Sequence, residues 1–561
     1  MSEKKTQREL QLDPEKIENF EHYLFEYFYV FGITPEIIYN EDIGVIRDNV
    51  NSNKIAYKKL IVPELISRFP PCNKPLICMD EKVILSHAFP LGYNIANGET
   101  EPQNEIFHFS LDNFISYDYN KKIYFTVYII YEPYSKIIKT IKKYKTTQFA
   151  QEKKRKNYKR KNSFSKETQF YNNYYTTIKS RPDVVFYKYD DKKYQRRRSY
   201  SKIFYKPEFD ITLYDHDLKK ANQIFFPKAL VMSSLTAYPD IHEKVLKNLN
   251  NIILKGSSDV PIEKHLETLF THVLYLPKNQ SNVFVQMPNG NLLIKQRCIN
   301  ELPSPNYKMG YLFTFTLDAL VQIFKNILLE IPTLFFGKDK NVLTNLFETF
   351  SSFLFPFRYQ YPNCSILPKE NYAAIVREKT FFFGINQTYN SKFFLDNNIC
   401  LKGKKIFIVD IDKKKVIEYF FENENNPIII FTKEEEVKKD EREINFEKLD
   451  ISGIGLPDHA KKKMKEKINE GKANYEDKNY SALREGANIK ISNSFFYFFM
   501  LCFGDYLKYM YLEKNEIMEI FEIIHTAKKI PIEKLFKVDL FLKTKSKSDQ
   551  TFYLQFINTQ M

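Results

Sequence analysis

The pattern of apolar and polar residues predicts a small α/β unit in the first part of the chain. Apolar residues recur on one face of Ile17–Phe31 at the spacing of a helix, whereas Lys82–Phe89 and Ile106–Ser110 have the composition of strands. The segment Tyr124–Tyr131 (YFTVYIIY) is apolar on both faces, which is typical of a strand in the middle of a sheet. Together these elements predict a compact unit over residues 15–135.

A second pattern begins near Phe225 and is rich in helices. Helical periodicity is found in three segments: Ile241–Leu254, Ile262–Leu274 and Leu317–Leu329. Between the last two of these helices, Val283–Met287 and Asn291–Ile294 flank a Pro-Asn-Gly turn, which is the arrangement of a β-hairpin.

Strands and helices then alternate, and this alternation predicts βαβ units with a largely parallel sheet. The predicted strands are Thr333–Phe336, Gln360–Leu367 and Thr380–Ile385, and the predicted helices are Val342–Leu354 and Lys369–Val376. A hairpin follows, with strands Lys405–Asp410 and Lys415–Phe420 on either side of Asp412-Lys413-Lys414. After a mixed-charge linker, three helices are expected over Asp458–Asn469, Ser494–Leu512 and Glu516–His525.

The composition supplies enough apolar material for more than one domain. Of the 561 residues, 43% are apolar and 16% are aromatic, which excludes a chain that is disordered throughout. The nine-residue run Phe495–Phe503 suits a buried helix and is shorter than a membrane span. The N-terminus is polar, without a signal-peptide core, and none of the six cysteines has CxxC spacing, so we expect a cytoplasmic protein.

The net charge of +15 is concentrated in one segment. Residues 136–206 hold 23 basic and 5 acidic residues, which leaves 61 basic and 64 acidic residues elsewhere. Like charges at this density repel one another, so we expect a largely disordered insertion. Its basic clusters are candidates for binding an anionic surface: Lys153, Lys154, Arg155, Lys156, Lys159, Arg160, Lys161, Arg196, Arg197 and Arg198.

Four interpretations of this basic insertion remain open. It is a solvated loop, or it binds an anionic membrane, an acidic protein or nucleic acid. Nucleic acid is the least favoured of these, because the chain lacks the motif of a helix-turn-helix or a zinc finger.

A search for motifs of bond-making chemistry is largely negative. Each Gly-Lys pair lacks the glycine five residues earlier that a phosphate loop needs, and neither GxGxxG nor GxSxG spacing occurs. His265 and His272 would lie about 10 Å apart along one helix, too far to share a metal ion easily. Asp410 and Asp412 suit a hairpin edge better than a paired-carboxylate site. The sequence therefore predicts no enzyme, no cofactor and no metal, and it favours a protein that acts by binding.

Short blocks near the N-terminus form a series in chain order. They are Leu24–Phe28 running to Gly32, the block His87–Gly92 (HAFPLG), and the paired strands Phe107–Phe109 and Tyr124–Glu132. This series resembles the upstream segment of the DENN-domain family, in which a Cys-Phe-Pro-x-Gly block precedes two strands.

Two further series resemble the central and downstream segments of the same family. The central blocks are Phe226–Leu230 (FPKAL) with Ser233, Ser234 and Tyr238-Pro239, then Ile327–Glu330, Leu334–Phe336, Leu354–Tyr359, Ile366–Pro368 and Phe382–Ile385. The downstream blocks are Phe495–Tyr506 and Phe552–Gln560. The resemblance divides the chain into residues 1–135 (upstream), 136–206 (insertion), 207–432 (central) and 433–561 (linker and downstream helices).

The resemblance implies a fold and a function. The fold is a longin-like N-lobe with a three-layer α/β C-lobe and appended C-terminal helices. The function is guanine-nucleotide exchange on a Rab-type GTPase, whose switch regions dock on both lobes, in a cytoplasmic protein recruited to intracellular membranes or vesicles. Alternatives are an adaptor or scaffold without exchange activity, and a variant that stimulates GTP hydrolysis through an inserted arginine. Pro227, Lys228, Tyr238 and Asp240 are candidates for GTPase binding, and packing within the scaffold is the competing role for the same residues.

Overall fold

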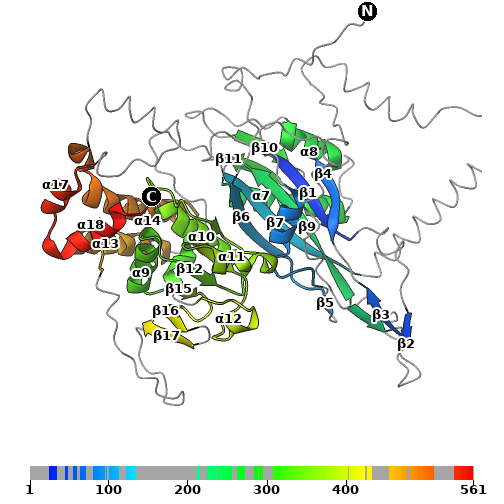
Figure 1. The fold of residues 1–561 in the computed structure, drawn as a ribbon. Coiled ribbons are helices and arrows are strands. Elements are labelled where there is room, and N and C mark those ends of the chain that lie inside the picture. The colour runs from blue at the N-terminus through cyan, green and yellow to red at the C-terminus, as the bar shows by residue number, and fades with distance from the viewer. Residues whose placement is uncertain are drawn as a thin grey trace, which may run out of the picture.

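The computed structural model places two β-sheets and their covering helices side by side (Figure 1). It describes residues 25–33, 45–47, 55–59, 63–70, 80–94, 96–97, 100–112, 122–133, 211–214, 224–235, 237–255, 262–271, 283–287, 290–294, 308–401, 404–423, 426–431, 454–476, 481–510 and 536–559. The basic segment 136–206 and the predicted helix Glu516–His525 lie outside these ranges. The result is a mixed α/β protein.

The first sheet is antiparallel and takes its central strand from beyond the basic segment. Its order is β4 (Glu64–Phe69), β1 (Tyr27–Gly32), β9 (Ile224–Ser234), β7 (Lys122–Pro133) and β6 (Glu105–Asp112), with the short β5 (Ala96–Asn97) also paired to β9. The predicted strands at Ile106–Ser110 and Tyr124–Tyr131 are confirmed as β6 and β7. A smaller sheet joins β2 (Val45–Arg47), β3 (Ile55–Lys59) and β8 (Ile211–Tyr214).

The helix predicted over Ile17–Phe31 is wrong for its last five residues, which belong to β1. Tyr27, Tyr29 and Phe31 alternate onto one face of the sheet, where all three are buried. Backbone pairing of β1 with β4 on one side and β9 on the other outweighs the local helical periodicity. Residues 17–24 lie outside the described ranges.

The strand predicted over Lys82–Phe89 is also wrong, because this segment forms helix α3 (Glu81–Ala88). Asp80 caps the helix by accepting a hydrogen bond from the Lys82 amide at 2.9 Å. Ile84, His87 and Ala88 are buried at a spacing of three and four residues, which presents one apolar face to the first sheet.

Helices and a hairpin cover one face of the first sheet. Helices α7 (Pro239–Lys255) and α8 (Ile262–Thr271) and the hairpin of β10 (Val283–Met287) and β11 (Gly290–Ile294) lie over this face, and each of them was predicted. The core between them and the sheet contains Phe28, Tyr128, Leu230, Met232, Val245, Leu249, Leu269 and Val285. We call this part of the protein, residues 25–294, the N-terminal unit.

The second sheet has the parallel core that the alternating pattern predicts. Its order is β13 (Asn363–Cys364), β14 (Phe382–Ile385), β12 (Thr333–Phe336), β15 (Lys405–Asp410), β16 (Lys415–Asn423) and β17 (Asn426–Phe431). The first four strands are parallel, and β15 to β17 are antiparallel. The predicted helices correspond to α9 (Leu317–Leu328), α10 (Lys340–Phe353) and the shorter α11 (Ala373–Arg377).

The strand predicted over Gln360–Leu367 is reduced to the two residues of β13. Beyond Cys364 the chain leaves the sheet, and the backbone of Ser365 lies directly against Gly384 of β14. A Cβ atom on Gly384 would be 2.0 Å from the Ser365 carbonyl oxygen. The absence of a side chain at residue 384 therefore permits this close approach of two backbones.

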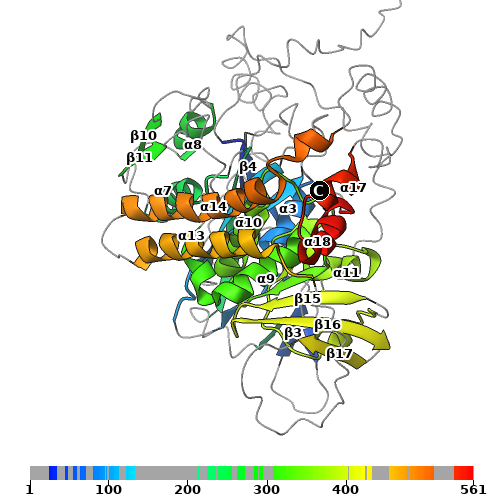
Figure 2. The same cartoon turned by 90° about the vertical axis from the view of Figure 1, so that its left-hand side faces the viewer.

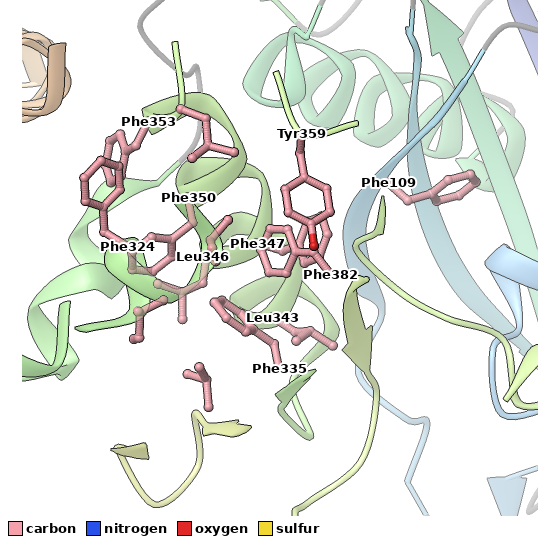
Figure 3. Close-up of a cluster of buried hydrophobic side chains, with 14 of the residues drawn as sticks. Phe109, Phe324, Phe335, Leu343, Leu346, Phe347, Phe350, Phe353, Tyr359 and Phe382 are labelled. Atoms are coloured by element: carbon pink, nitrogen blue, oxygen red, sulfur yellow. The ribbon is translucent and has the colours of Figure 1, made fainter. Parts of the chain in front are cut away.

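Helix α10 lies between the second sheet and the C-terminal helices (Figure 3). Its Phe347 ring stacks on Phe382 of β14 with a centroid distance of 3.8 Å. One and a half turns on, Phe353 stacks at 3.8 Å on Phe495 of α14 (Ser481–Phe503). The predicted helix Ser494–Leu512 is confirmed as far as Phe503 and is part of the core, although Tyr497 and Met500 are exposed on its other side. The prediction is wrong beyond Phe503, where α14 ends and a 3-10 helix over Tyr506–Tyr509 follows.

The C-terminal helices complete this core (Figure 2). Helix α13 (Asp458–Glu476) packs along α14, and helices α17 (Val538–Lys543) and α18 (Lys547–Ile557) place Phe541 and Phe556 against Phe503. We call residues 308–559 the C-terminal unit. None of the described helices has both the length and the apolarity of a membrane span.

Substitution of two glycines tests this packing. We expect Gly384→Ala to destabilise the protein by about 3 kcal/mol, the upper end of the usual range for overpacking, because the new methyl group would overlap the Ser365 backbone. Gly486→Ala in α14 should stabilise it by about 1 kcal/mol, since nothing lies within 4 Å and alanine favours helix. Thermal or urea unfolding of the two variants measures both effects, and a stable Gly384→Ala protein would contradict the close approach.

Candidate functional site

Pro227 and Lys228, two of the predicted binding residues, lie in β9 in the middle of the first sheet. Pro227 is buried, and its carbonyl oxygen accepts a hydrogen bond from the hydroxyl of Tyr93 at 2.8 Å. Lys228 is half-buried, with its Nζ 2.7 Å from Oε2 of Glu132 on the neighbouring strand β7. Both residues therefore have a structural role in this sheet.

Tyr238 and Asp240, the other two predicted residues, lie at the N-terminus of α7. The Tyr238 carbonyl oxygen accepts the amide hydrogens of Ile241 and His242, and Asp240 occupies the exposed first turn. Asp240 carries the charge that the positive N-terminal end of a helix dipole favours.

The structure separates these four residues into two places. His242, in the first turns of α7, lies beside Thr126, which pairs with Met232 of β9. Met232 is four residues from Lys228, or about 13 Å along the strand. Asp240 lies two residues before His242 on α7, so it is near the Met232 end of β9. Lys228 and Asp240 therefore belong to different parts of the surface.

Tyr238 and Asp240 lie close to the contact between the two units. Strand β6 is an edge strand of the first sheet, and α10 of the C-terminal unit packs along its free side. The amide of His108 donates a hydrogen bond to Thr344 Oγ1 at 3.4 Å, and the hydroxyl of Ser110 donates one to Glu348 Oε1 at 2.8 Å. We call this contact, from β6 to α10, the interunit interface.

Three further polar contacts extend the interunit interface at its ends. Lys340 Nζ forms an ion pair with Glu105 at 2.5 Å and lies over the ring of Phe107. Lys122 Nζ donates to Asn363 Oδ1 at 2.9 Å. The sulfur atom of Cys364 lies 3.4 Å from Nε2 of His87. These contacts join residues that are 235 to 277 positions apart in the chain, and they fix the orientation of one unit against the other.

A buried polar network lies directly behind the interface. The hydroxyl of Thr126 is 2.9 Å from Nδ1 of both His108 and His242, so it donates to one ring and accepts from the other. Burial lowers the pKa of both histidines to about 3. Both rings are therefore neutral at pH 7, and one must carry its proton on Nδ1.

The opening of the interface to solvent is charged. Lys308, at the start of the C-terminal unit, lies 3.2 Å from Glu243 of α7, and its amide donates to Asn345 Oδ1 of α10. Burial alone would raise the pKa of Glu243, but Lys247 and Lys308 outweigh burial and lower it. Although Asp240 is exposed, partial loss of hydration beside its neighbours raises the pKa of its carboxyl, and Lys308 opposes this effect. This opening therefore combines charged side chains from both units.

The remaining predicted residues lie elsewhere in the structure or outside the described ranges. Asp410 accepts a hydrogen bond from the Lys413 amide, and Asp412 accepts from the Lys338 amide and from Thr388, so both stabilise the hairpin end as predicted. His265 lies in α8, whereas His272 and the ten basic residues of segment 136–206 lie outside the described ranges. Within the described ranges, no group of three or more His, Cys, Asp or Glu side chains is placed to hold a metal ion.

A comparison with protein-family models identifies a domain in the middle of the chain. Residues 225–414 match the model of the DENN (AEX-3) domain. The chain therefore contains a DENN domain over these residues. The match begins at β9 and ends after β15, so it includes α7, Lys308 and α10 but neither β6 nor β7. The interunit interface therefore joins the matched DENN region to strands that precede it in the chain.

Sequence reasoning missed most of the interface of this DENN-domain protein. Four residues of the interface belong to no recognisable motif, and none of them is of a type that is unusual for its strand, helix or loop. They are Ser110, Thr126, Lys308 and Glu348. A polar residue at an inward-facing position of an apolar strand, such as Thr126 in YFTVYIIY, was the one available signal.

The neutral histidines make the stability of the protein depend on pH. Because their folded pKa values lie below the ordinary value of 6.5, their contribution is complete above pH 6.5 and is lost as the pH falls toward 3. We expect the thermal midpoint to fall between pH 6.5 and 4. His242→Asn should make this fall shallower, because asparagine does not titrate.

The exposed His459 of α13 provides the matched control for this measurement. The His459→Asn protein should follow the wild-type curve of thermal midpoint against pH. If His242→Asn also followed the wild-type curve, the buried network would not be the source of the pH dependence.

Proposed function

We propose that this DENN-domain protein is a guanine-nucleotide exchange factor for a Rab-type small GTPase. The observation that carries the proposal is the DENN match over residues 225–414, because DENN domains are generally associated with this activity. The proposal assigns the GTPase switch regions to a surface formed by both units. The charged opening of the interunit interface, with Tyr238 and Asp240, is the part of that surface that we assign to binding.

The proposed mechanism requires differential binding and no nucleophile. A factor that binds the nucleotide-free GTPase more tightly than the GDP-bound form must weaken GDP binding by the same ratio. A weakening of about 1,000-fold corresponds to about 4 kcal/mol. A rigid surface is suited to this task, because a surface that yielded to the switch loops would spend binding energy on its own rearrangement. The hydrogen bonds of Ser110 and His108 across the interface supply such rigidity.

We also propose the finer division of the fold on the basis of family resemblance. The N-terminal unit, which adds residues 211–294 of the central segment to the upstream segment, corresponds to a longin-like lobe. The C-terminal unit corresponds to a three-layer α/β lobe with appended helices. The boundaries at residues 135, 206 and 432 remain part of this proposal, as does a cytoplasmic protein recruited to intracellular membranes.

A panel of purified Rab GTPases loaded with fluorescent GDP tests the exchange proposal. We expect the full chain at micromolar concentration to accelerate GDP release from at least one Rab. Asp240→Lys should reduce this acceleration by about tenfold or more, since it reverses a charge on the proposed binding surface. Asp396→Lys, on the exposed helix α12 (Phe393–Asp396), is the matched charge reversal and should leave exchange unchanged.

The same panel separates the alternatives. Rab binding without accelerated GDP release would favour an adaptor or scaffold, and faster GTP hydrolysis with unchanged release would favour stimulation through an inserted arginine. No accelerated release from any Rab would remove the exchange proposal.

We further propose that the basic segment 136–206 attaches the protein to an anionic membrane. Its net charge of +18 would be attracted to an anionic leaflet by about 1 kcal/mol for each basic residue near the surface. Deletion of residues 140–200 should reduce binding to vesicles containing phosphatidylserine and leave exchange in solution intact. Unchanged vesicle binding would contradict this role, and retained binding to RNA but not to vesicles would favour nucleic acid.

A further inference from the structure

A pocket lies in the C-terminal unit, away from the interunit interface. It opens where α9, β15 and β16 meet Ile454, four residues before α13, and the last helix α18, elements that Figure 2 shows close together. Its cavity volume is about 70 Å³, and the pocket opens to solvent. The polar residues that line it are Lys325, Asn326, Lys405, Glu418, Tyr419 and Gln555.

Positive charge exceeds negative charge around this pocket. Burial lowers the pKa of Lys325, and the nearby Lys461 and Lys405 lower it further, against the opposing effect of Glu418. Burial also lowers the pKa of Lys405. Within the part of the chain that the structure describes, neither Lys325 nor Lys405 forms an ion pair. Three lysines and one glutamate leave a formal charge of about +2 at the pocket.

The single carboxylate is held by amide groups. Oε1 of Glu418 accepts hydrogen bonds from Asn326 Nδ2 at 3.2 Å and from Gln322 Nε2 at 3.5 Å. These contacts hold the glutamate against helix α9, so the ammonium groups of Lys325 and Lys405 have no anion within ion-pair distance among the described residues.

Two of the side chains that line the pocket, those of Asn326 and Gln555, each have a buried amide oxygen without a hydrogen-bond donor within the described ranges. Asn326 is fully buried, and its Oδ1 accepts no hydrogen bond within the described ranges. The Oε1 atom of Gln555, from α18, is in the same situation. A buried acceptor without a donor is costly, commonly by about 1–3 kcal/mol. The two oxygens therefore favour a ligand that brings hydroxyl donors.

We propose that this pocket binds a phosphate monoester carried on a polyhydroxylated group. The phosphate, with a charge of about −1.5 to −2 at neutral pH, would lie between Lys325 and Lys405 and neutralise the excess of positive charge. The hydroxyl groups would donate hydrogen bonds to Asn326 Oδ1 and Gln555 Oε1. A soluble sugar phosphate and the headgroup of an inositol lipid share this chemistry.

A simpler explanation accounts for one part of the arrangement. Lys325 lies in the last turn of α9, where the helix dipole favours a cation. The dipole explains neither Lys405, which lies on a strand, nor the two unpaired amide oxygens. A ligand with an anionic group and hydroxyl groups explains all four residues.

Calorimetric titration of the full chain tests the proposal with three probes: inorganic phosphate, glucose 6-phosphate and glycerophosphoinositol 4-phosphate. We expect at least one of the two polyol phosphates to bind at least tenfold more tightly than inorganic phosphate. Lys325→Gln with Lys405→Gln should weaken that binding at least tenfold. Lys462→Gln with Lys463→Gln, on the exposed face of α13, removes the same charge and should leave it unchanged.

Thermal unfolding without ligand shows whether the double glutamine variant is correctly folded. Because Lys325 and Lys405 are half-buried and lie near each other with like charges, the double glutamine variant should unfold at the same or a higher temperature than the wild type. Gln555→Met should remove the preference for a polyol phosphate over inorganic phosphate while retaining binding of phosphate itself. Equal binding by the wild type and the lysine variant, or no binding of any probe, would overturn the proposal.

The probe that binds most tightly identifies the source of the ligand. Tighter binding of glycerophosphoinositol 4-phosphate, together with a lysine-dependent gain on vesicles containing 5% phosphatidylinositol 4-phosphate (about one lipid in twenty), would identify a lipid headgroup. Tighter binding of glucose 6-phosphate without that gain would identify a soluble metabolite. Either outcome is independent of Rab exchange, because no pocket residue belongs to the interunit interface.

Discussion

The free edge of strand β6 is the constraint on which the arrangement of this protein depends. An edge strand has unpaired backbone groups, and these must find partners or remain in contact with water. Here helix α10 of the other unit covers the edge, and Thr344 accepts the amide hydrogen of His108. The same helix packs Phe347 against Phe382 on its own sheet. One helix therefore covers the free edge of the first sheet and also packs against the second sheet.

The polar character of this interface has a physical consequence for specificity. An apolar contact between two units tolerates sliding, whereas a buried hydrogen bond such as that of Ser110 with Glu348 has one satisfactory geometry. Displacement by even a few ångströms would leave a buried carboxylate without a donor. The network of Thr126 with two neutral histidines imposes the same requirement behind the interface. A proposed GTPase-binding surface built from both units would gain its fixed shape from these contacts.

The sequence predicted those elements whose local pattern agrees with their final environment. Strand β7, helix α7, the β10–β11 hairpin and the parallel core of the second sheet all have the period of the structure that they form. The predictions failed at β1, where pairing on both sides overrides helical periodicity, and at α3, where the cap at Asp80 decides the conformation.

The candidate site was harder to predict because its contacts join distant parts of the chain. Ser110 and Glu348 are 238 positions apart, and neither belongs to a recognisable motif. Family blocks led to Tyr238 and Asp240, which the structure places beside the interface, but the same blocks led to Lys228, whose partner is Glu132 within the first sheet. Hydrogen exchange at individual amides tests most directly whether β6 and α10 form one cooperative interface. The account predicts that β6 and α10 exchange slowly and together, and that Glu348→Ala accelerates both equally while Glu348→Gln does not. Rapid exchange of the His108 amide with α10 still protected would contradict it.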